Sequence, residues 1–466
     1  MIDKISVIGL GKLGASMAAA FASRGFDVIG VDVNQRSIEL VNEGRAPVQE
    51  TGLDELISAN RHRIRATASH EEAVLGSDIS FVIVPTPSDE RGAFSLQYAA
   101  WAFKEIGKAL GKKNSYHNVV LTSTVLPGGV REALLPILEK ESGKKAGKDF
   151  GLCYSPEFIA LGSIIRNFLN PDFTLIGEFD DRCGSQLEEL YSRVVENGAP
   201  SARMSLENAE LTKISVNAFV TTKITFANFL AEMCEKIPGG NIDIVSNALG
   251  MDSRIGRKYL TGGLGYGGPC FPRDNFALGF LARELGVDEH LSSTTDSLNR
   301  SVAKKVVERL RPMIRENITV GVLGLSYKPF SHVLEESQAL FIAQAISRAG
   351  ARVVAYDPMA SEMPQEELRG DFVVVDSVEE CIRQSEIILI ATPDPAFAEL
   401  KANNFKNGFS KVTVVDFWRI LKNELEKSEN IRYVGFGLGQ DDGSNSKRLR
   451  ELWTGGGPEE LVTGAK

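Results

Sequence analysis

The chain has 466 residues, of which 43% are hydrophobic and 24% are charged. At roughly 100–200 residues per domain, this length predicts two or three domains. The formal net charge of −9 argues against nucleic-acid binding through phosphate neutralisation by the whole surface. No apolar run approaches the ~18 residues that indicate a membrane span. The composition is therefore that of an ordinary globular protein.

The cysteines and the first residues indicate a reducing compartment. The five cysteines are far apart and form no CxxC pair, so neither a zinc site nor a disulfide framework is predicted. The five histidines have no metal-ligand spacing either. The first residues lack the basic segment of a signal peptide and are typical of a buried strand. We therefore expect a cytoplasmic protein that holds no metal.

The first part of the chain alternates predicted strands and helices. Strands are predicted at 4–9, 27–32, 79–87, 118–124 and 173–178, with helical patterns between most of them. A βαβα order is typical of a parallel sheet that helices cover on both faces.

A long helical pattern occupies the middle of the chain. Residues 207–237 have apolar side chains at helical spacing and no internal Gly or Pro, and Pro238 ends the run. A helix of about 30 residues would be ~45 Å long, so it could bridge two domains and pack in a dimer.

The last part returns to the strand–helix order. Strands are predicted at 318–329, 351–358, 386–395 and 411–417, and the segment before 395 parallels the one before 87. The sequence therefore predicts an α/β fold in which two Rossmann-like, doubly wound domains are joined by a central long-helix domain.

A glycine motif follows the first predicted strand. Gly9, Gly11 and Gly14 have the spacing GxGxxG, in which the first permits a tight turn and the second admits a pyrophosphate. Asp32 ends the next strand, where a carboxylate accepts from ribose hydroxyls and repels a 2′-phosphate. NAD is therefore favoured over NADP, and the alternative is a glycine-rich turn that serves packing only. The predicted cofactor-binding residues are Gly9, Gly11, Leu13, Gly14, Asp32, Thr86 and Ser123.

The most informative segment is GGLGYGGPCFPRD at 262–274. Its many glycines leave bare backbone against which a bulky ligand can lie. Asp274 follows Cys270 by four residues. From these residues alone, Cys270 is equally well a buried cysteine after a loop, which is the usual position of a free thiol.

This segment is similar to the active-site segment of the UDP-glucose/GDP-mannose dehydrogenase family. Other motifs of that family are matched in the same order by STVLPGG (123–129), SPEFI (155–159), ELTKISVNAF (210–219), RIGRKYL (254–260) and GLSYKP (324–329). The resemblance covers roughly residues 4–420. It implies NAD-dependent, four-electron oxidation of a nucleotide-sugar C-6 alcohol to the carboxylate, with a thioester on a cysteine as the intermediate.

The resemblance assigns roles to a set of catalytic candidates. Cys270 would be the nucleophile that adds to the aldehyde. Lys213 and Asn217, which lie on one face of a helix because they are four residues apart, would donate to the oxyanion. Asp274 would orient the site and assist proton transfer. For Lys213 and Asn217 the alternative is an ordinary solvated helix surface.

Water activation is assigned to the first domain. Glu157 would be the general base that activates water against the thioester, and Thr124 would position that water. Taken alone, a glutamate is most often a surface residue, so this role rests on the SPEF match.

The resemblance also implies substrate contacts. These are Phe158, Arg254, Tyr259, Tyr266, Gly267, Lys328 and Arg419. Lys328 would contact a phosphate, and Arg419 would be a further substrate-side cation. Arg254 matches an arginine lent to a neighbouring subunit, which implies a homodimer. For each of them the alternative is a surface cation or a core aromatic.

The expected domains are an NAD-binding domain (1–200), a central helical domain for catalysis and dimerisation (201–305), a nucleotide-sugar-binding domain (306–437) and a flexible tail (438–466). Three positions depart from the family pattern: Leu161 stands where an acidic residue is usual, Ser37 where a basic one is, and Glu335 where an arginine reaches toward the cofactor. These departures leave the catalytic set intact but do not identify the sugar.

Several functions remain open at this point. The first hypothesis is oxidation of UDP-glucose to UDP-glucuronate, and the same chemistry on a UDP-N-acetylhexosamine or GDP-mannose is the alternative. A two-electron β-hydroxyacid dehydrogenase would not need Cys270, Glu157 or the third domain. A non-catalytic NAD-binding scaffold would have no use for the joint presence of the catalytic set.

Overall fold

The computed structural model describes residues 2–159, 162–315, 318–368, 372–406, 408–440 and 443–454. The chain divides into two compact units. The N-terminal unit consists of residues 1–216 and 280–287, and the C-terminal unit of residues 217–279 and 288–466. Leu161 lies outside the described residues.

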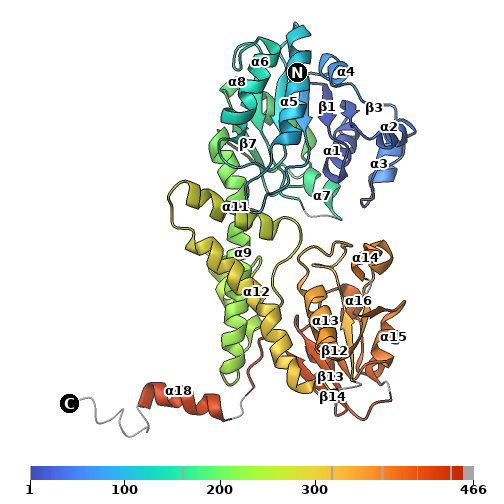
Figure 1. The fold of residues 1–466 in the computed structure, drawn as a ribbon, viewed down its shortest axis with the longest axis vertical. Helices are drawn as coiled ribbons and strands as arrows, with labels where there is room; N and C mark the ends of the chain where they lie inside the picture. The colour runs from blue at the N-terminus through green and yellow to red at the C-terminus, as the bar shows by residue number, and fades with distance from the viewer. Residues whose placement is uncertain are drawn as a thin grey trace, which may run out of the picture. The chain divides into compact units, whose positions relative to one another are not determined.

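The N-terminal unit is built on an eight-stranded sheet (Figure 1). Its strands are β1 (Lys4–Ile8), β2 (Asp27–Val31), β3 (Ile64–Thr67), β4 (Ile79–Val82), β5 (Asn118–Leu121), β6 (Gly151–Tyr154), β7 (Thr174–Glu178) and β8 (Ser201–Ser205). Their order in the sheet is β3-β2-β1-β4-β5-β6-β7-β8. The order reverses between β1 and β4, which is where a doubly wound sheet forms its ligand crevice.

One pair in this sheet differs from the all-parallel prediction. β6 and β7 are antiparallel, with Cys153 opposite Glu178, whereas the other neighbouring strands are parallel. The helix between them, α7 (Ile164–Leu169), has six residues and is therefore only about 9 Å long. The six-residue helix at 70–75 leads from β3 to β4, which run in the same direction, so helix length alone does not set the direction of β7.

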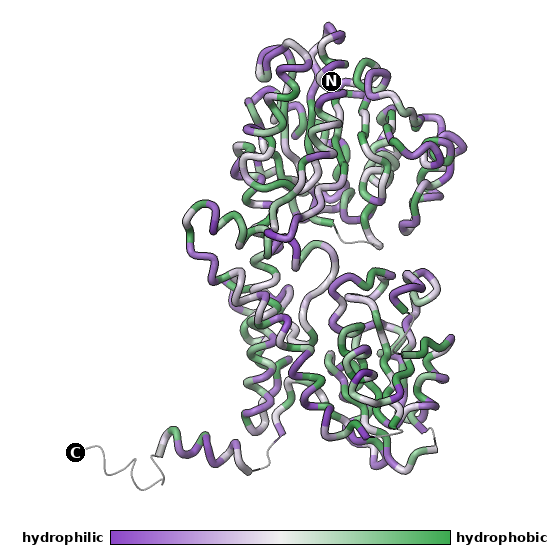
Figure 2. The backbone as a smooth tube through the Cα atoms, in the orientation of Figure 1, coloured by the Kyte–Doolittle hydropathy of each residue, from purple (hydrophilic) through white to green (hydrophobic). Residues whose placement is uncertain are grey.

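Helices cover both faces of the sheet, as predicted. On one face α1 (Lys12–Ser23), α3 (Leu53–Ala59), α7 and α8 (Asp181–Val194) pack into a core with the inward residues of the strands. On the other face pack α4 (His70–Leu75), α5 (Gln97–Lys112), the π-helix η1 (Gly129–Leu134) and α6 (Leu135–Ser142). In Figure 2 the strands are mostly hydrophobic, because both of their faces are buried.

The predicted long helix is confirmed as α9 (Leu206–Lys236). It begins in the N-terminal unit and ends in the C-terminal unit, since the division falls between Val216 and Asn217. Three further helices follow it: α10 (Ile242–Met251), α11 (Phe271–Glu284) and α12 (His290–Leu310). No helix among the described residues is long and apolar enough to cross a membrane.

The C-terminal unit contains a six-stranded parallel sheet. Its strands are β9 (Thr319–Leu323), β10 (Arg352–Tyr356), β11 (Val373–Val374), β12 (Ile387–Ile390), β13 (Val412–Asp416) and β14 (Ile431–Gly435). Their order, β11-β10-β9-β12-β13-β14, repeats that of the first six strands of the N-terminal sheet. The helices around it are α13 (Gln338–Arg348), α14 (Gln365–Leu368), α15 (Val378–Arg383), α16 (Pro395–Ala398) and α17 (Lys422–Leu425).

The two sheets share the turn after their first strand. In the N-terminal unit Asp32 accepts from the backbone N–H of Leu10 at 2.6 Å. In the C-terminal unit Asp357 accepts from the N–H of Leu325 at 2.7 Å. The repeat inferred from the sequence therefore extends to the hydrogen bonds of this turn, and the predicted fold class is confirmed.

The segment expected to be a flexible tail contains a helix, α18 (Ser444–Thr454). Before it, Leu438 forms an isolated bridge with Asn241. Residues 441–442 and 455–466 lie outside the described part of the chain.

Candidate active site

The glycine motif forms the turn between β1 and α1. Gly9 has φ of 101°, and a Cβ there would lie 2.1 Å from the carbonyl oxygen of Ile83. A Cβ on Gly14 would lie 1.9 Å from the oxygen of Gly9. Gly11 differs, because a Cβ there would meet no protein atom within 4 Å. The protein therefore needs Gly9 and Gly14 for its own packing, whereas the bare backbone at Gly11 faces open space.

This turn fits a dinucleotide. Gly11 is the N-cap of α1, and as a glycine it has no side chain that could cap the first N–H groups of that helix. Such N–H groups, with the positive end of the helix dipole, bind a pyrophosphate. Leu13 lies in the first turn and is partly buried against the core. The predicted glycine set is thus brought together at one helix N-terminus.

Asp32 stands where a ribose-binding carboxylate is expected. Its Oδ2 accepts from the N–H of Leu10 at 2.6 Å, and its Oδ1 accepts from the N–H of Asn34 at 2.8 Å. These bonds hold the carboxylate at the end of β2. Ser37 is buried, and the adjacent Arg36 is exposed and pairs with Glu39 at 3.6 Å. Neither residue therefore supplies a fixed cation beside Asp32.

Thr86 and Ser123 hold the ends of two strands together. The Ser123 hydroxyl accepts from the N–H of Val84 at 2.9 Å and donates to its carbonyl at 2.6 Å. The Thr86 hydroxyl donates to the carbonyl of Thr124 at 2.8 Å. Because both hydroxyls are buried and bonded to backbone, the structure gives them a role in shaping this edge of the sheet.

The SPEF motif and α9 meet within the N-terminal unit. The Nζ of Lys213 donates to the backbone carbonyl of Glu157 at 2.5 Å and lies 4.6 Å from the centre of the Phe158 ring. Burial raises the pKa of Glu157 to about 8, while the nearby Lys213 opposes that rise. Lys213, Glu157 and Phe158 are therefore brought together, as the family motifs imply.

Glu210, one turn before Lys213, is a buried carboxylate that sequence reasoning missed. It accepts from the N–H groups of Gly128 at 2.7 Å and Val130 at 2.8 Å. Burial raises its pKa to about 7. It thereby ties the glycine turn of the STVLPGG motif to α9. Two signals pointed to it: a charged residue within the apolar pattern of this helix, and its place at the start of the family motif ELTKISVNAF.

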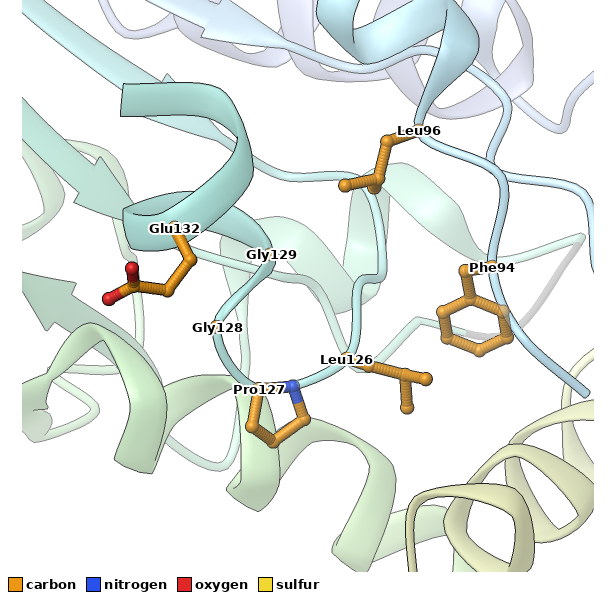
Figure 3. Close-up of a pocket in the computed structure, with 7 residues that line it drawn as sticks. All are labelled: Phe94, Leu96, Leu126, Pro127, Gly128, Gly129 and Glu132. Atoms are coloured by element: carbon orange, nitrogen blue, oxygen red, sulfur yellow. The ribbon is translucent and has the colours of Figure 1, made fainter. Parts of the chain in front are cut away.

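The other side of the same turn borders a shallow hollow of about 310 Å³ (Figure 3). Phe94 and Leu126 point into it, whereas the Glu132 carboxylate points away. The hollow is lined by Phe94, Leu96, Leu126, Pro127, Gly128, Gly129 and Glu132.

Cys270 lies at the start of α11 in the C-terminal unit. It is exposed, whereas Cys153, Cys183, Cys234 and Cys381 are buried. Its carbonyl accepts from the N–H of Asp274 at 2.8 Å, which is the first turn of the helix. The alternative of a buried structural cysteine is therefore wrong for Cys270. Burial, with Cys270 nearby, raises the pKa of Tyr327 to about 12.

Asp274 is almost fully buried, with 1% of its side chain exposed. Its Oδ2 accepts from Nδ2 of Asn217 at 2.7 Å, and Oδ1 lies 3.2 Å from Nη2 of Arg273. The C-terminal unit thus joins two of the predicted catalytic residues, Asn217 on α9 and Asp274 on α11.

The glycines before Cys270 serve the protein's own packing, which corrects the sequence interpretation of bare backbone for a ligand. A Cβ on Gly263 would lie 2.7 Å from the Trp418 ring, and one on Gly265 would lie 2.4 Å from Oδ1 of Asn299. At Gly267, a predicted substrate contact, the Cβ would lie 2.3 Å from the oxygen of Glu336. The segment from Thr261 to Gly268, called the glycine loop below, is therefore packed against its neighbours.

Two asparagines that the sequence did not single out hold the glycine loop. Asn228 on α9 accepts from the N–H of Gly263 at 2.8 Å and donates to the carbonyl of Leu264 at 3.3 Å. Asn299 on α12 accepts from the N–H of Tyr266 at 2.8 Å and donates to its carbonyl at 3.0 Å. An asparagine in a helix has no distinctive pattern, so only the folded chain shows this role.

Arg419 is also directed at the glycine loop. Its guanidinium donates to Asp243 through two bonds of 2.9 Å and to the carbonyls of Thr261 at 3.0 Å and Gly262 at 3.1 Å. It also donates to the carbonyls of Phe417 and Phe436. Every N–H of the group has a protein acceptor, and its side chain is 1% exposed. The predicted substrate-side arginine is thus an internal clamp.

The remaining substrate candidates lie in the C-terminal unit, where Tyr259 and Tyr266 both contact the ring of Phe271. Arg254 is exposed over 85% of its side chain and pairs with Asp252 at 2.6 Å. Tyr259 is half-exposed and has φ of 67°. The Tyr266 hydroxyl donates to Asp296 at 3.5 Å, and burial raises the pKa of Tyr266. Lys328 lies 5.6 Å from the ring centre of Tyr327.

Glu335, one of the three departures from the family pattern, lies beside the glycine loop. The backbone carbonyl of Glu335 accepts from the N–H of Gly268 at 2.9 Å, and its side chain is exposed.

The described residues contain no group of three or more His, Cys, Asp or Glu side chains suited to a metal ion.

Comparisons with known proteins identify the three parts of the chain. Residues 3–195 match the NAD-binding domain of the UDP-glucose/GDP-mannose dehydrogenase family, residues 207–301 its central domain, and residues 321–423 its UDP-binding domain. UDP-glucose 6-dehydrogenase AglM of Haloferax volcanii is 35% identical over 401 residues, covering 85% of this chain and 93% of the relative. GDP-mannose 6-dehydrogenase of Pseudomonas aeruginosa is 32% identical, covering 89% and 97%.

A solved structure agrees with these matches. A UDP-glucose dehydrogenase from Pyrobaculum islandicum superposes with a TM-score of 0.83 at 32% identity, covering 94% of this chain and 98% of that one. The chain therefore belongs to the UDP-glucose/GDP-mannose dehydrogenase family and is an NAD-dependent nucleotide-sugar dehydrogenase.

Proposed function

We propose that the chain oxidises UDP-glucose to UDP-glucuronate through a thioester on Cys270. The observation that carries the proposal is an exposed thiol at the start of α11, one helical turn from the buried Asp274, which accepts from Asn217. A helix N-terminus stabilises a thiolate. The adjacent amide supplies an N–H for an oxyanion. A two-electron dehydrogenase would not need an exposed thiol, nor the amide of Asn217 near it.

NAD, when bound at Gly11 and Asp32, accepts a hydride in each of the two oxidations. The thiolate of Cys270 adds to the aldehyde carbon that the first oxidation produces, and a thiohemiacetal oxyanion forms. Lys213 and Asn217, on consecutive turns of α9, are the donors proposed for that oxyanion. The second oxidation converts the thiohemiacetal to the thioester.

Hydrolysis of the thioester needs a base and a placed water. Glu157, with a pKa of about 8, is matched to proton abstraction at mildly alkaline pH, where its carboxylate is ionised. Thr124 is proposed to position the water, because Thr86 fixes its backbone. Water adds to the thioester carbonyl, its proton goes to Glu157, and the thiolate of Cys270 leaves as the carboxylate forms.

We also propose a homodimer that uses α9. Large apolar side chains are exposed along this helix at helical spacing: Phe219 (67%), Phe226 (49%), Phe229 (50%) and Met233 (46%). An apolar stripe of this kind is typical of a subunit interface. The exposed Arg254 is suited to the role of a residue shared between subunits. Light scattering after gel filtration tests the dimer, and a monomer at micromolar concentration would contradict it.

The function is tested by offering UDP- and GDP-sugars with NAD and following NADH absorbance. We expect UDP-glucose to be the best substrate and two NADH to form per carboxylate. GDP-mannose is the second candidate, because the relatives that act on it are about as similar as AglM. One NADH per product, with free aldehyde accumulating, would contradict the four-electron reaction.

Two variants of the nucleophile complete the test. Cys270→Ala should abolish carboxylate formation while folding changes by no more than about 1–2 kcal/mol. Cys270→Ser should accumulate an ester at residue 270, because an alkoxide is a poorer leaving group than a thiolate. Intact mass would show this adduct. Cys153→Ala, at a buried thiol, is the control and should keep full activity.

A further inference from the structure

The glycine loop lacks a neighbouring strand, yet its backbone is held at defined points. One of these points is Asn299, whose side-chain amide bonds both the N–H and the carbonyl of Tyr266. Such a pair of bonds is what an antiparallel neighbour would make to one residue of a strand. Asn299 is 3% exposed, so water does not offer Tyr266 an equivalent partner.

The fit between Asn299 and the loop is close. A Cβ at position 265 would lie 2.4 Å from Oδ1 of Asn299 and 3.1 Å from its backbone oxygen. The loop can therefore approach α12 this closely only because residue 265 is a glycine. Any shift of Asn299 moves the backbone of Tyr266 with it.

Tyr266 transmits this position to the start of α11. Its ring meets the ring of Phe271 edge-on, with centroids 6.4 Å apart. Phe271 follows Cys270 directly and is the first residue of α11. The Tyr259 ring meets Phe271 in the same edge-on manner at 6.3 Å. The aromatic ring beside Cys270 is thus held by two tyrosines, of which Tyr266 is itself fixed by Asn299.

We propose that Asn299 is a positioning residue for the Cys270 thiol. It acts through Tyr266 and Phe271, and touches neither the thiol nor a substrate. By fixing the first turn of α11, it keeps the thiol at the N-terminal, positive end of that helix, which favours the thiolate. The proposal rests on the function proposed for Cys270, but its test does not require that function.

The test is the rate at which iodoacetamide alkylates Cys270 across a range of pH. Cys270 is the exposed cysteine and the other four are buried, so peptide mass spectrometry assigns the label without ambiguity. In Asn299→Ala we expect the midpoint of the alkylation profile to move to higher pH, because a loosened first turn stabilises the thiolate less. With substrate, kcat should fall by about tenfold or more, while KM for NAD stays unchanged.

Two further variants and a control separate positioning from general loss of stability. Asn299→Asp keeps an acceptor for the Tyr266 N–H but has no amide donor, so an intermediate shift is expected. Gly265→Ala should shift the profile in the same direction as Asn299→Ala, because its methyl group collides with Asn299. Asn118→Ala removes a buried amide of the N-terminal sheet, which bonds Gln186, and should leave the profile unchanged.

Two results would overturn the proposal. One is a wild-type alkylation profile in folded Asn299→Ala or Gly265→Ala. The other is an equal shift in Asn118→Ala, which would make the effect one of stability alone. Failure of the proposed function has a different signature, namely full activity of Cys270→Ala with the alkylation results unaffected.

Discussion

The side-chain amide of Asn217 donates a 2.7 Å hydrogen bond to the buried carboxylate of Asp274. Because an amide nitrogen has two hydrogens, fixing one of them sets the direction of the other. Asp274 therefore determines where Asn217 can offer its second N–H. This relationship gives Asp274 an orienting role that requires an acceptor and not, in itself, a charge.

Replacement of Asp274 separates orientation from proton transfer. In Asp274→Ala the amide loses its partner, and kcat should fall by about 10²–10³, the usual effect of losing one oxyanion donor. Asp274→Asn keeps an oxygen that can accept from Asn217, so a smaller loss is expected. Steady-state measurements of kcat and KM on the two variants test these expectations. Equal losses would show that the negative charge or a proton transfer is essential.

The pH dependence of carboxylate formation should report Glu157. Its pKa of about 8 means that the carboxyl is protonated at lower pH and cannot act as a base. The rate of thioester hydrolysis should therefore rise with pH and level off above about 8. In Glu157→Gln this rise of the rate with pH should disappear. A thioester of residue 270 should accumulate and be visible by intact mass.

The same raised pKa has a consequence for stability. A carboxyl whose folded-state pKa lies above its unfolded value stabilises the folded chain fully below the unfolded pKa. That contribution is lost as the pH rises through about 8. Glu157→Gln should therefore melt at a higher temperature than the wild type at alkaline pH, with a smaller difference in acid. A difference that did not vary with pH would contradict the assignment.

Cofactor choice should depend on Asp32. A carboxylate facing the ribose should make NAD better than NADP by about 10² in kcat/KM or more. Asp32→Asn should reduce that preference, and it should also weaken the turn, because Asp32 accepts from Leu10 and Asn34. Equal use of both cofactors by the wild type would mean that Asp32 does not face the ribose.

Asp357 is the matched control for this experiment. It makes the corresponding bonds, to the N–H groups of Leu325 at 2.7 Å and Met359 at 2.8 Å, in the other sheet. Asp357→Asn should therefore lower the melting temperature in a similar way and leave the NAD preference intact. This comparison removes the effect of stability from the result.

We expect replacement of Arg419 to lower the free energy of unfolding more than it changes the affinity for the substrate. Arg419→Lys removes most of the bonds to Asp243 and the glycine loop and should cost about 2–3 kcal/mol of unfolding free energy. This loss of unfolding free energy is smaller than the loss expected for a fully buried ion pair, because the Asp243 side chain is 39% exposed. Chemical denaturation measures it, with Arg254→Lys, at an 85% exposed side chain, as the control. A raised KM for the sugar nucleotide at unchanged stability would restore the substrate role.

Much of this molecule was predictable because local rules determine it. The strand–helix alternation, the uninterrupted helical pattern at 207–237 and the GxGxxG spacing depend on neighbouring residues, and each is confirmed. The strands that were missed are β3, β6, β8, β11 and β14. Four of them, β3, β8, β11 and β14, are the edge strands of the two sheets and are only partly buried. They therefore lack the continuous apolar run that strands buried on both faces carry.

The direction of β7 and the purpose of the glycines before Cys270 depended on the folded chain. The alternation of strands and helices predicts a parallel neighbour for β6, whereas β7 pairs with it in the antiparallel direction. A glycine has the same appearance in a sequence whether a ligand or the protein fills the space of its missing Cβ. Trp418 and Asn299 fill that space here, from positions 155 and 34 residues away from Gly263 and Gly265.

The sequence by itself determined the fold class, the cofactor turn and the presence of a cysteine in a glycine-rich segment, since these follow from local patterns and from a family resemblance. Only the tertiary structure decided that Arg419 faces inward, that Glu210 caps the STVLPGG turn, and that Asn299 holds Tyr266. The physical reason is that a buried polar group must find a partner. Which partner it finds depends on which distant backbone groups folding brings within about 3 Å of it.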